Sequence, residues 1–436
     1  MQIPSLGTAF PRLTAWATGL AGAPIESETA GPVAANDRFD ASGRVEKTNE
    51  LPFPPSANAE VDVRGRFASK TWAWTEHLFD RDPHFKQQNF HPRGEQQGAE
   101  VVAAFGNSTP HSGSVLLHYA GPPPQGVKKQ PVPVVLVHGA NKNGDFWCDP
   151  KETDGQPGLP ERLREQGFDV YAVSFAHPHD DNFFWAESLA NSIERVRQLT
   201  GAEQVDLVAH SKGGAPARAY VSDMRQDWMT PYRGDVRRLA LVGAANGGLD
   251  VGFRHPSSNL ALMGASDSPL LNAPMTWDSV KMFGVLPVDT RDRSYSNEVR
   301  DYWPGQDQLL ARWDSKYPLA FWEPDWYTTY EGGEGFLSHS KGIDHYIAQG
   351  GHYIERLNQA QIDPQVEVAL LAGDRPNLPG IANETTGPSD GLLFVQSALH
   401  MPSTRNIKAK TVLHLNHKAL VSDPEGQQWI ANVLKT

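Results

Sequence analysis

The stretch Val205-Asp-Leu-Val-Ala-His-Ser-Lys-Gly-Gly214 decides the fold of this 436-residue chain. Three apolar residues in its first half predict a short strand that is buried on both faces, as in a parallel sheet. The strand runs directly into Ser211, with Ala209 two residues before it and Gly213 two after it. Residues this small permit a sharp strand-to-helix turn, which holds the serine in a strained conformation with its hydroxyl exposed. The sequence therefore predicts a reactive serine at the end of a buried strand.

The residues after the serine, 214–221, predict a helix with Pro216 in its first turn, where the missing N–H costs little. The Ala-His-Ser-x-Gly pattern resembles the nucleophile elbow of α/β-hydrolases, and its alanine form is similar to that of some bacterial lipases. Taken alone, the five residues also fit a surface serine in a glycine-rich helix N-terminus. The rest of the chain must separate the two interpretations.

Composition narrows the class of protein. With 39% hydrophobic residues the chain can bury one large core with an insertion, which we favour over two domains. A net charge of -12 argues against nucleic acid as a partner, because phosphate binding needs a basic surface. No apolar run is long enough for a transmembrane segment. The single cysteine, Cys148, leaves the redox compartment open, and with no visible signal peptide the protein could be secreted in mature form or cytoplasmic.

The chain before the serine divides into an extension and a sheet. Residues 1–95 are rich in Pro, Gly and Asn, and we interpret them as an extension wrapped on the core. The alternating runs 101–105 and 114–119 predict an antiparallel edge. Strands at 134–137 and 168–174, with a helix whose buried face carries Leu189, Ile193 and Val196, predict a parallel doubly wound sheet. The resemblance implies an α/β-hydrolase catalytic domain over residues 96–436.

A segment rich in aromatic residues follows the strand at 238–243. Residues 249–364 show no regular alternation of strand and helix and contain many Trp and Tyr side chains. Their place between a central strand and the strand at 365–372 predicts a cap or lid inserted over the serine. The aromatic side chains would line an apolar pocket or pack the small core of the insertion itself.

A serine nucleophile needs a base and an acid, and α/β-hydrolases carry them in the order Ser, acid, His. His417 lies in an Asn-His-x-x-Leu pattern that resembles the histidine loop of bacterial lipases, and His414 is the alternative base. Asp390 lies in a Ser-Asp-Gly-Leu-Leu segment similar to the acid segment of the same lipases, and Asp374 is the alternative acid. The resemblance implies a triad of Ser211, Asp390 and His417.

The oxyanion hole follows from the same resemblance. In these hydrolases a strand ending in His-Gly, here 138–139, is followed by a residue whose backbone N–H binds the oxyanion. Ala140 is that residue, and Lys212 after the nucleophile supplies the second N–H. A lysine beside the nucleophile is unusual. Two interpretations stay open: its side chain points into solvent, or it raises the local positive potential and favours anionic or polar substrates.

No cofactor is expected. The turn His177-Pro-His-Asp-Asp181 contains ligand-type residues, and some lipases of this group bind structural calcium or zinc. The spacing fits no established zinc pattern, because a proline between two histidines does not place them on one helix face. We therefore predict no metal ligands here, with a structural calcium ion as the alternative.

The combined pattern predicts a lipase-like serine ester hydrolase that acts on a small-molecule or lipid ester through an acyl-enzyme. A polyester depolymerase or an esterase for bulky alcohol groups is the alternative with the same triad. A catalytically inactive hydrolase fold serving as a binding protein is the alternative from another class.

Overall fold

The computed structural model describes residues 61–90, 98–255, 279–281, 287–289, 302–320, 324–335, 338–379, 381 and 383–435. Most of the predicted extension, residues 1–60 and 91–95, lies outside the described residues. In the described part of the chain, no helix is long and apolar enough to cross a membrane.

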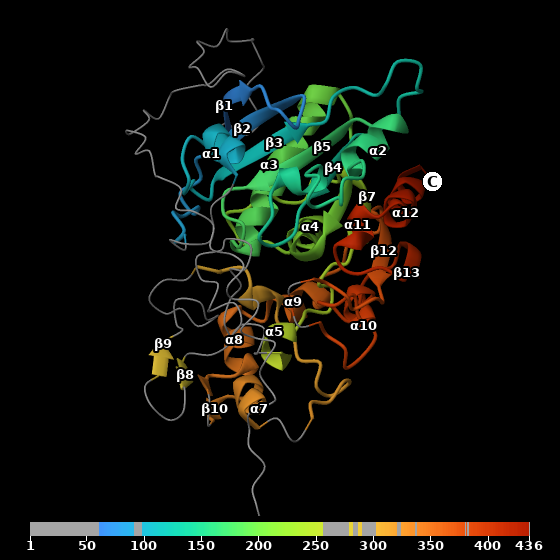
Figure 1. Ribbon diagram of the computed structural model, residues 1–436. Helices are drawn as coiled ribbons and strands as arrows, with labels where there is room; N and C mark the ends of the chain where they lie inside the picture. The colour runs from blue at the N-terminus through green and yellow to red at the C-terminus, as the bar shows by residue number, and fades with distance from the viewer. Residues whose placement is uncertain are drawn as a thin grey trace, which may run out of the picture. The chain divides into compact units, whose positions relative to one another are not determined.

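A nine-stranded, mostly parallel sheet forms the centre of the fold, with the strand order β1-β2-β3-β5-β4-β6-β7-β12-β13. The neighbours from β5 to β13 run parallel, and β1, β2 and β3 form an antiparallel edge beside β5 (Figure 1). The predicted α/β-hydrolase architecture is confirmed. The strands are β1 (Val61–Phe67), β2 (Trp74–Asp80), β3 (Ser114–Tyr119), β4 (Val134–Val137), β5 (Val170–Phe175), β6 (Val205–His210), β7 (Val236–Val242), β12 (Glu367–Gly373) and β13 (Ile407–Leu413).

Helices cover both faces of the sheet because its central strands are apolar on both sides. Every residue of β4, β5 and β6 is buried. Helices α3 (Asn182–Thr200) and α4 (Gly214–Val221) pack against one face. Helices α2 (Leu159–Glu165), α11 (Ala419–Ser422) and α12 (Pro424–Lys435) pack against the other. This layering leaves the carboxyl ends of the parallel strands for the site.

The predicted strand over 101–105 is wrong. These residues belong to helix α1 (Ala99–Phe105), which ends at Gly106 in a left-handed conformation with φ 82°. Val101, Ala104 and Phe105 are the buried positions, a spacing that fits one helix face as well as an alternating strand. Five apolar residues were too few to separate the two periods.

The predicted strand over 114–119 is confirmed as β3, and it forms the antiparallel edge together with two strands from the predicted extension. Strand β1 pairs with β2, and β2 pairs with β3. The buried carboxylate of Glu76 in β2 binds Arg66 of β1 at 2.8 Å and Arg195 of α3 at 2.9 Å. The sheet domain therefore begins by Val61, and the predicted boundary at residue 95 lies within it.

The insertion between β7 and β12 contains short elements and a second, four-stranded sheet. Tyr330 packs with Phe253, Leu310, Ile343 and Tyr346 in a small core of its own. Trp277 and the side chains of Trp322, Trp326 and Tyr327 lie outside the described residues. The described elements are α5 (Val251–Arg254), β8 (Ser279–Lys281), β9 (Pro287–Asp289), η5 (Asp307–Leu309), α7 (Pro324–Glu331), β10 (Gly333–Glu334), β11 (Ser338–Ser340), α8 (Ile343–Gln349) and α9 (Tyr353–Gln359).

Candidate active site

Ser211 stands on a tight turn at the carboxyl end of β6. Its φ is 56°, in the left-handed region that non-glycine residues rarely adopt. The turn continues through a short 3-10 helix, η2 (Ser211–Gly213), into α4, as the sequence predicts. A Cβ at Gly213 would lie 2.4 Å from the His138 carbonyl oxygen, so only glycine fits there. Ser211 is half-buried, whereas the strand before it is fully buried.

His417 and Asp390 form a buried pair. His417 follows β13 in the loop before α11, and its Nδ1 lies 2.8 Å from Asp390 Oδ2. The two side chains are 7% and 1% exposed. Backbone N–H groups of Leu392 and Leu393 donate to Asp390 Oδ1 at 3.0 and 2.8 Å. Because a carboxylate oxygen accepts, Nδ1 is the donor in this contact, and in the tautomer with its single proton on Nδ1 the Nε2 atom is left as an acceptor.

Gly243 makes room for this pair at the end of β7. Its φ is 51°, and a Cβ there would lie 3.2 Å from His417 Nδ1 and 3.4 Å from Asp390 Oδ2. It would also lie 3.0 Å from Cδ1 of Leu420. The end of β7 therefore needs a glycine for two reasons, its backbone conformation and the approach of the imidazole.

The alternative acid and base pair with each other. His414 Nδ1 lies 2.8 Å from Asp374 Oδ1, and the side chains are 76% and 41% exposed. His414 lies just after β13, where the sequence predicted a strand-face position. The structure thus brings Asp390 to His417 and places Asp374 in a separate, solvent-exposed pair.

His210, the last residue of β6, contacts the histidine loop. Its Nε2 lies 3.0 Å from the backbone oxygen of His417, so Nε2 carries the proton and donates it to that carbonyl. The ring stacks on Phe146 of the 3-10 helix η1 (Gly144–Trp147), with centroids 5.4 Å apart. Burial holds the pKa of His210 well below its ordinary value, which keeps the ring neutral. The residue beside Ser211 therefore fixes the loop that carries His417.

The Gly139–Ala140 peptide lies against Ser211. A Cβ at Gly139 would lie 2.7 Å from the Ser211 Cβ. His138 Nδ1 donates to the Gly139 carbonyl at 2.8 Å, and burial lowers the pKa of His138 to about 3. In a planar trans peptide the C=O and the following N–H point in opposite directions. The buried histidine therefore turns the Ala140 N–H away from itself.

The two predicted oxyanion donors are the backbone N–H groups of Ala140 and Lys212. No loop or strand oxygen in the described part of the chain accepts a hydrogen bond from either of them. Neither does Ser211 Oγ form a hydrogen bond with any side chain or backbone group of the described residues, His417 included. Ser211, the His417 imidazole and the backbone N–H groups of Ala140 and Lys212 therefore lie near the carboxyl end of β6. Ser211 and His417 are not hydrogen-bonded to each other.

The Lys212 side chain does not point into solvent, as one sequence-based expectation had it. It is 1% exposed, and its Nζ donates to the Asp180 carbonyl at 2.7 Å and to Asn182 Oδ1 at 2.8 Å. The ammonium also lies 3.5 Å from the centroid of the Trp185 ring. Burial lowers the pKa of Lys212 and raises that of Asp180.

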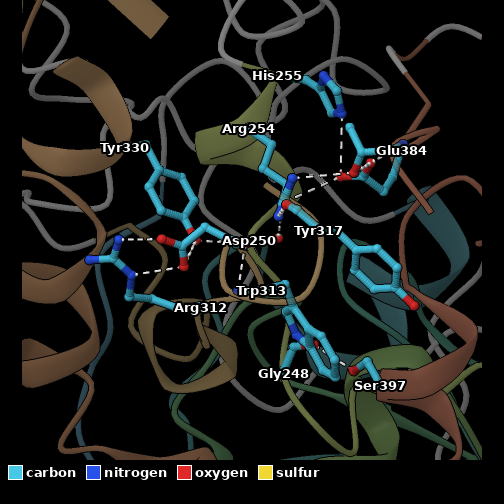
Figure 2. Close-up of polar contacts among 12 residues, drawn as sticks. Gly248, Asp250, Arg254, His255, Arg312, Trp313, Tyr317, Tyr330, Glu384 and Ser397 are labelled. Atoms are coloured by element: carbon cyan, nitrogen blue, oxygen red, sulfur yellow. Dashed lines mark hydrogen bonds and ion pairs between the residues drawn. The ribbon is translucent and has the colours of Figure 1, made fainter. Parts of the chain in front are cut away.

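A buried polar cluster beside the acid loop was missed by sequence reasoning. Figure 2 shows Arg254 of α5 between two carboxylates: its Nε lies 2.9 Å from Asp250 Oδ1 and 3.7 Å from Glu384 Oε2. The hydroxyl of Tyr330 donates to Asp250 at 2.8 Å. The Glu384 backbone N–H donates to the Gly391 carbonyl at 2.9 Å, next to Asp390. The cluster joins the start of the insertion to the acid loop.

No sequence pattern pointed to this cluster. Asp250 and Glu384 lie far apart in the chain, and a lone acid after a strand or in a loop is ordinary. Burial raises the pKa of Asp250 to about 6, which is opposed by the charge of Arg254.

The turn at 177–181 uses its polar groups within the protein. His177 Nε2 donates to the Asn89 carbonyl at 3.1 Å, and His179 Nδ1 lies 2.7 Å from Gln306 Nε2. Among the described residues, no three His, Cys, Asp or Glu side chains converge in a way that could hold a metal ion.

Comparison with known proteins gives the family. A profile of the alpha/beta hydrolase family matches residues 134–376, more than half of the chain. A triacylglycerol lipase of Vibrio cholerae serotype O1 is 33% identical over 104 residues, which cover 24% of this chain and 31% of that lipase. The match therefore spans about a third of the curated relative's length.

Solved structures are similar at low sequence identity. Lipase BlEst2 of Bacillus licheniformis in its mature form has 17% identity and a TM-score of 0.40, covering 73% of this chain and 98% of that chain. Carboxylesterase CesB of Bacillus subtilis has 14% identity and a TM-score of 0.35, covering 74% of this chain and 88% of that chain. By the family profile and the strand order, this chain belongs to the alpha/beta hydrolase family.

Proposed function

We propose that this protein is a lipase-like carboxylic ester hydrolase with Ser211, His417 and Asp390 as its catalytic triad. The observation that carries the proposal is the 2.8 Å contact between Asp390 Oδ2 and His417 Nδ1 in a buried setting, because it leaves Nε2 as the base. The strained, half-buried Ser211 beside it supports the nucleophile role. The similarity to a triacylglycerol lipase over part of the chain favours an ester of a lipid or small alcohol as substrate.

The proposed reaction has two halves. His417 Nε2 takes the proton of Ser211 Oγ as the oxygen attacks the ester carbonyl, and the N–H groups of Ala140 and Lys212 bind the oxyanion. Collapse breaks the C–O bond to the alcohol, which leaves with the proton from His417. Water then attacks the acyl-enzyme, gives its proton to His417, and releases the acid as Ser211 regains its hydrogen.

The open contact between Ser211 and His417 is compatible with this chemistry. In structures without substrate, catalytic hydrogen bonds are often long or misaligned and tighten when substrate binds. Asp390 and His210 hold the imidazole loop by its ring and by its backbone oxygen, so the remaining adjustment lies in the serine side chain.

Rates on p-nitrophenyl esters from acetate to palmitate test the proposal, using the wild type and Ser211→Ala. We expect turnover in the wild type and a loss of about 10⁴-fold or more in Ser211→Ala. An optimum at long chains would favour a lipase, and one at short chains an esterase. Substantial turnover by a folded Ser211→Ala variant would contradict the assignment, and a wild type without turnover would favour a binding protein.

A further inference from the structure

The ammonium of Lys212 is buried against the residues that begin α3. Its Nζ donates to the Asp180 carbonyl and Asn182 Oδ1 and lies over Trp185. The carboxyl groups of Asp180 and Asp181 and the neutral rings of His138 and His179 are titratable groups near it. The side chain therefore joins the nucleophile turn to the loop that begins α3.

The same loop holds part of the insertion. The Gly305 N–H donates to the His179 carbonyl at 2.9 Å, and Asn182 Nδ2 donates to the Gly305 carbonyl at 3.1 Å. Gln308 Oε1 accepts from the backbone N–H of Asn182 at 2.7 Å and from its Nδ2 at 2.8 Å. One asparagine thus contacts Lys212 on one side and the insertion on the other.

Packing at this junction is close. A Cβ at Gly305 would lie 1.8 Å from the Asp180 carbonyl oxygen and 2.9 Å from Lys212 Nζ. The insertion segment 302–310 can therefore approach this loop so closely only because residue 305 is a glycine. Gly305 also lies directly against the Lys212 ammonium.

Burial of the ammonium has a free-energy cost. Removing an ammonium from water costs several kcal/mol in an apolar site, which paired groups only partly offset. A methionine would fill a similar volume without that cost, but it would leave the Asp180 carbonyl and Asn182 Oδ1 without this donor. Unlike a methionine, the ammonium donates hydrogen bonds in defined directions. These bonds fix the backbone of Asp180 and the side chain of Asn182 relative to Ser211.

We propose that Lys212 is a positioning residue: its ammonium fixes residues 180–182 and the docked insertion segment 302–310 against the nucleophile turn, and so keeps its own backbone N–H aimed at the oxyanion. This inference rests on the proposed function, since the oxyanion exists only in that reaction. Loss of the ammonium would weaken binding of the transition state more than binding of the ester.

Three variants test this role. Lys212→Met removes the ammonium. Gly305→Ala keeps the lysine, but its new methyl group meets the Asp180 carbonyl and Lys212 Nζ and so disturbs the contact between the insertion segment and the ammonium. Lys129→Met is the matched control, because the Lys129 side chain is 62% exposed and also pairs with a buried carboxylate, that of Asp169, at 2.6 Å. Each variant is assayed with p-nitrophenyl acetate, whose small acyl group makes few contacts, and with a trifluoromethyl ketone, which adds serine to form a bound oxyanion. Thermal unfolding checks that each is folded.

We expect Lys212→Met and Gly305→Ala to lower kcat by about 10- to 100-fold with KM changed less than about threefold. Affinity for the ketone should fall by a similar factor, and Lys129→Met should match the wild type. A folded Lys212→Met with kcat and ketone affinity within twofold of the wild type would overturn the inference. If Lys212→Met does not fold, the same result in Gly305→Ala overturns it.

A failure of the proposed function can be told apart from a failure of the positioning role. If a fluorophosphonate leaves Ser211 of the wild type unlabelled, the triad itself is wrong, whatever Lys212→Met does. Labelled, active wild type together with an unaffected Lys212→Met removes only the positioning role.

Discussion

Replacing Asp390 with asparagine should disable the base while leaving the fold intact. The carboxylate uses Oδ1 to accept two backbone N–H groups and Oδ2 to accept from His417 Nδ1. An asparagine must keep its oxygen on the backbone donors, so its NH₂ group faces Nδ1. The imidazole then has to accept at Nδ1 and carry its proton on Nε2, where it can no longer take the proton of Ser211.

The size of the expected rate loss follows from losing the His417 tautomer that carries its proton on Nδ1. We expect kcat/KM of Asp390→Asn to fall by about 10³- to 10⁴-fold, or about 4 to 5 kcal/mol of transition-state stabilisation. Initial rates on p-nitrophenyl butyrate measure it, with the unfolding midpoint as a check on the fold.

Asp374→Asn is the matched control. Asp374 contacts His414 at the same 2.8 Å distance, but that pair is exposed to solvent. Its kcat/KM should stay within twofold of the wild type. A loss below tenfold in Asp390→Asn, or an equal loss in Asp374→Asn, would refute the assignment of the acid.

Three further outcomes are expected. Gly243→Ala should lower the free energy of unfolding, measured in urea, by about 1 to 3 kcal/mol and should also lower kcat. The alanine would be strained in the left-handed conformation, and its methyl group would crowd His417. Unchanged stability and rate would contradict this. His210→Phe keeps the ring but loses the donor to the His417 carbonyl, so its kcat should fall, while His210→Gln should recover much of the loss; equal rates for the two variants would exclude the hydrogen bond as the cause. Burial raises the pKa of Asp250 to about 6, so the folded state binds a proton that the unfolded state releases above about pH 4. The free energy of unfolding of the wild type relative to Asp250→Asn should therefore fall as pH rises from about 4 through 6, and a flat difference would contradict the buried carboxyl.

The sequence predicts the parallel sheet because its strands are short, apolar and end in recognisable turns. The run 205–214 contains a buried strand, a glycine-limited turn and a helix start within ten residues, and the structure has each of them. Asp390 and His417 were selected from local patterns, and the structure brings the two together. Their catalytic roles stay a prediction.

Contacts between distant segments could not be read in this way. The apolar positions of residues 99–105 fit the periodicity of a helix and that of a strand, so only the packing of this segment against β2 and β3 decides between helix and strand. Strands β1 and β2 lie in a stretch of mixed composition, and their pairing depends on Glu76 reaching Arg195 more than a hundred residues later. The burial of Lys212 likewise depends on Asp180, Asn182 and the insertion.

Labelling with a fluorophosphonate, followed by mass spectrometry of the modified peptide, tests the central claim most directly. The account predicts one label per chain, attached to Ser211, with ester hydrolysis lost in proportion to labelling, and much slower labelling in His417→Ala. A label on another residue, or full hydrolysis after Ser211 is labelled, would contradict it.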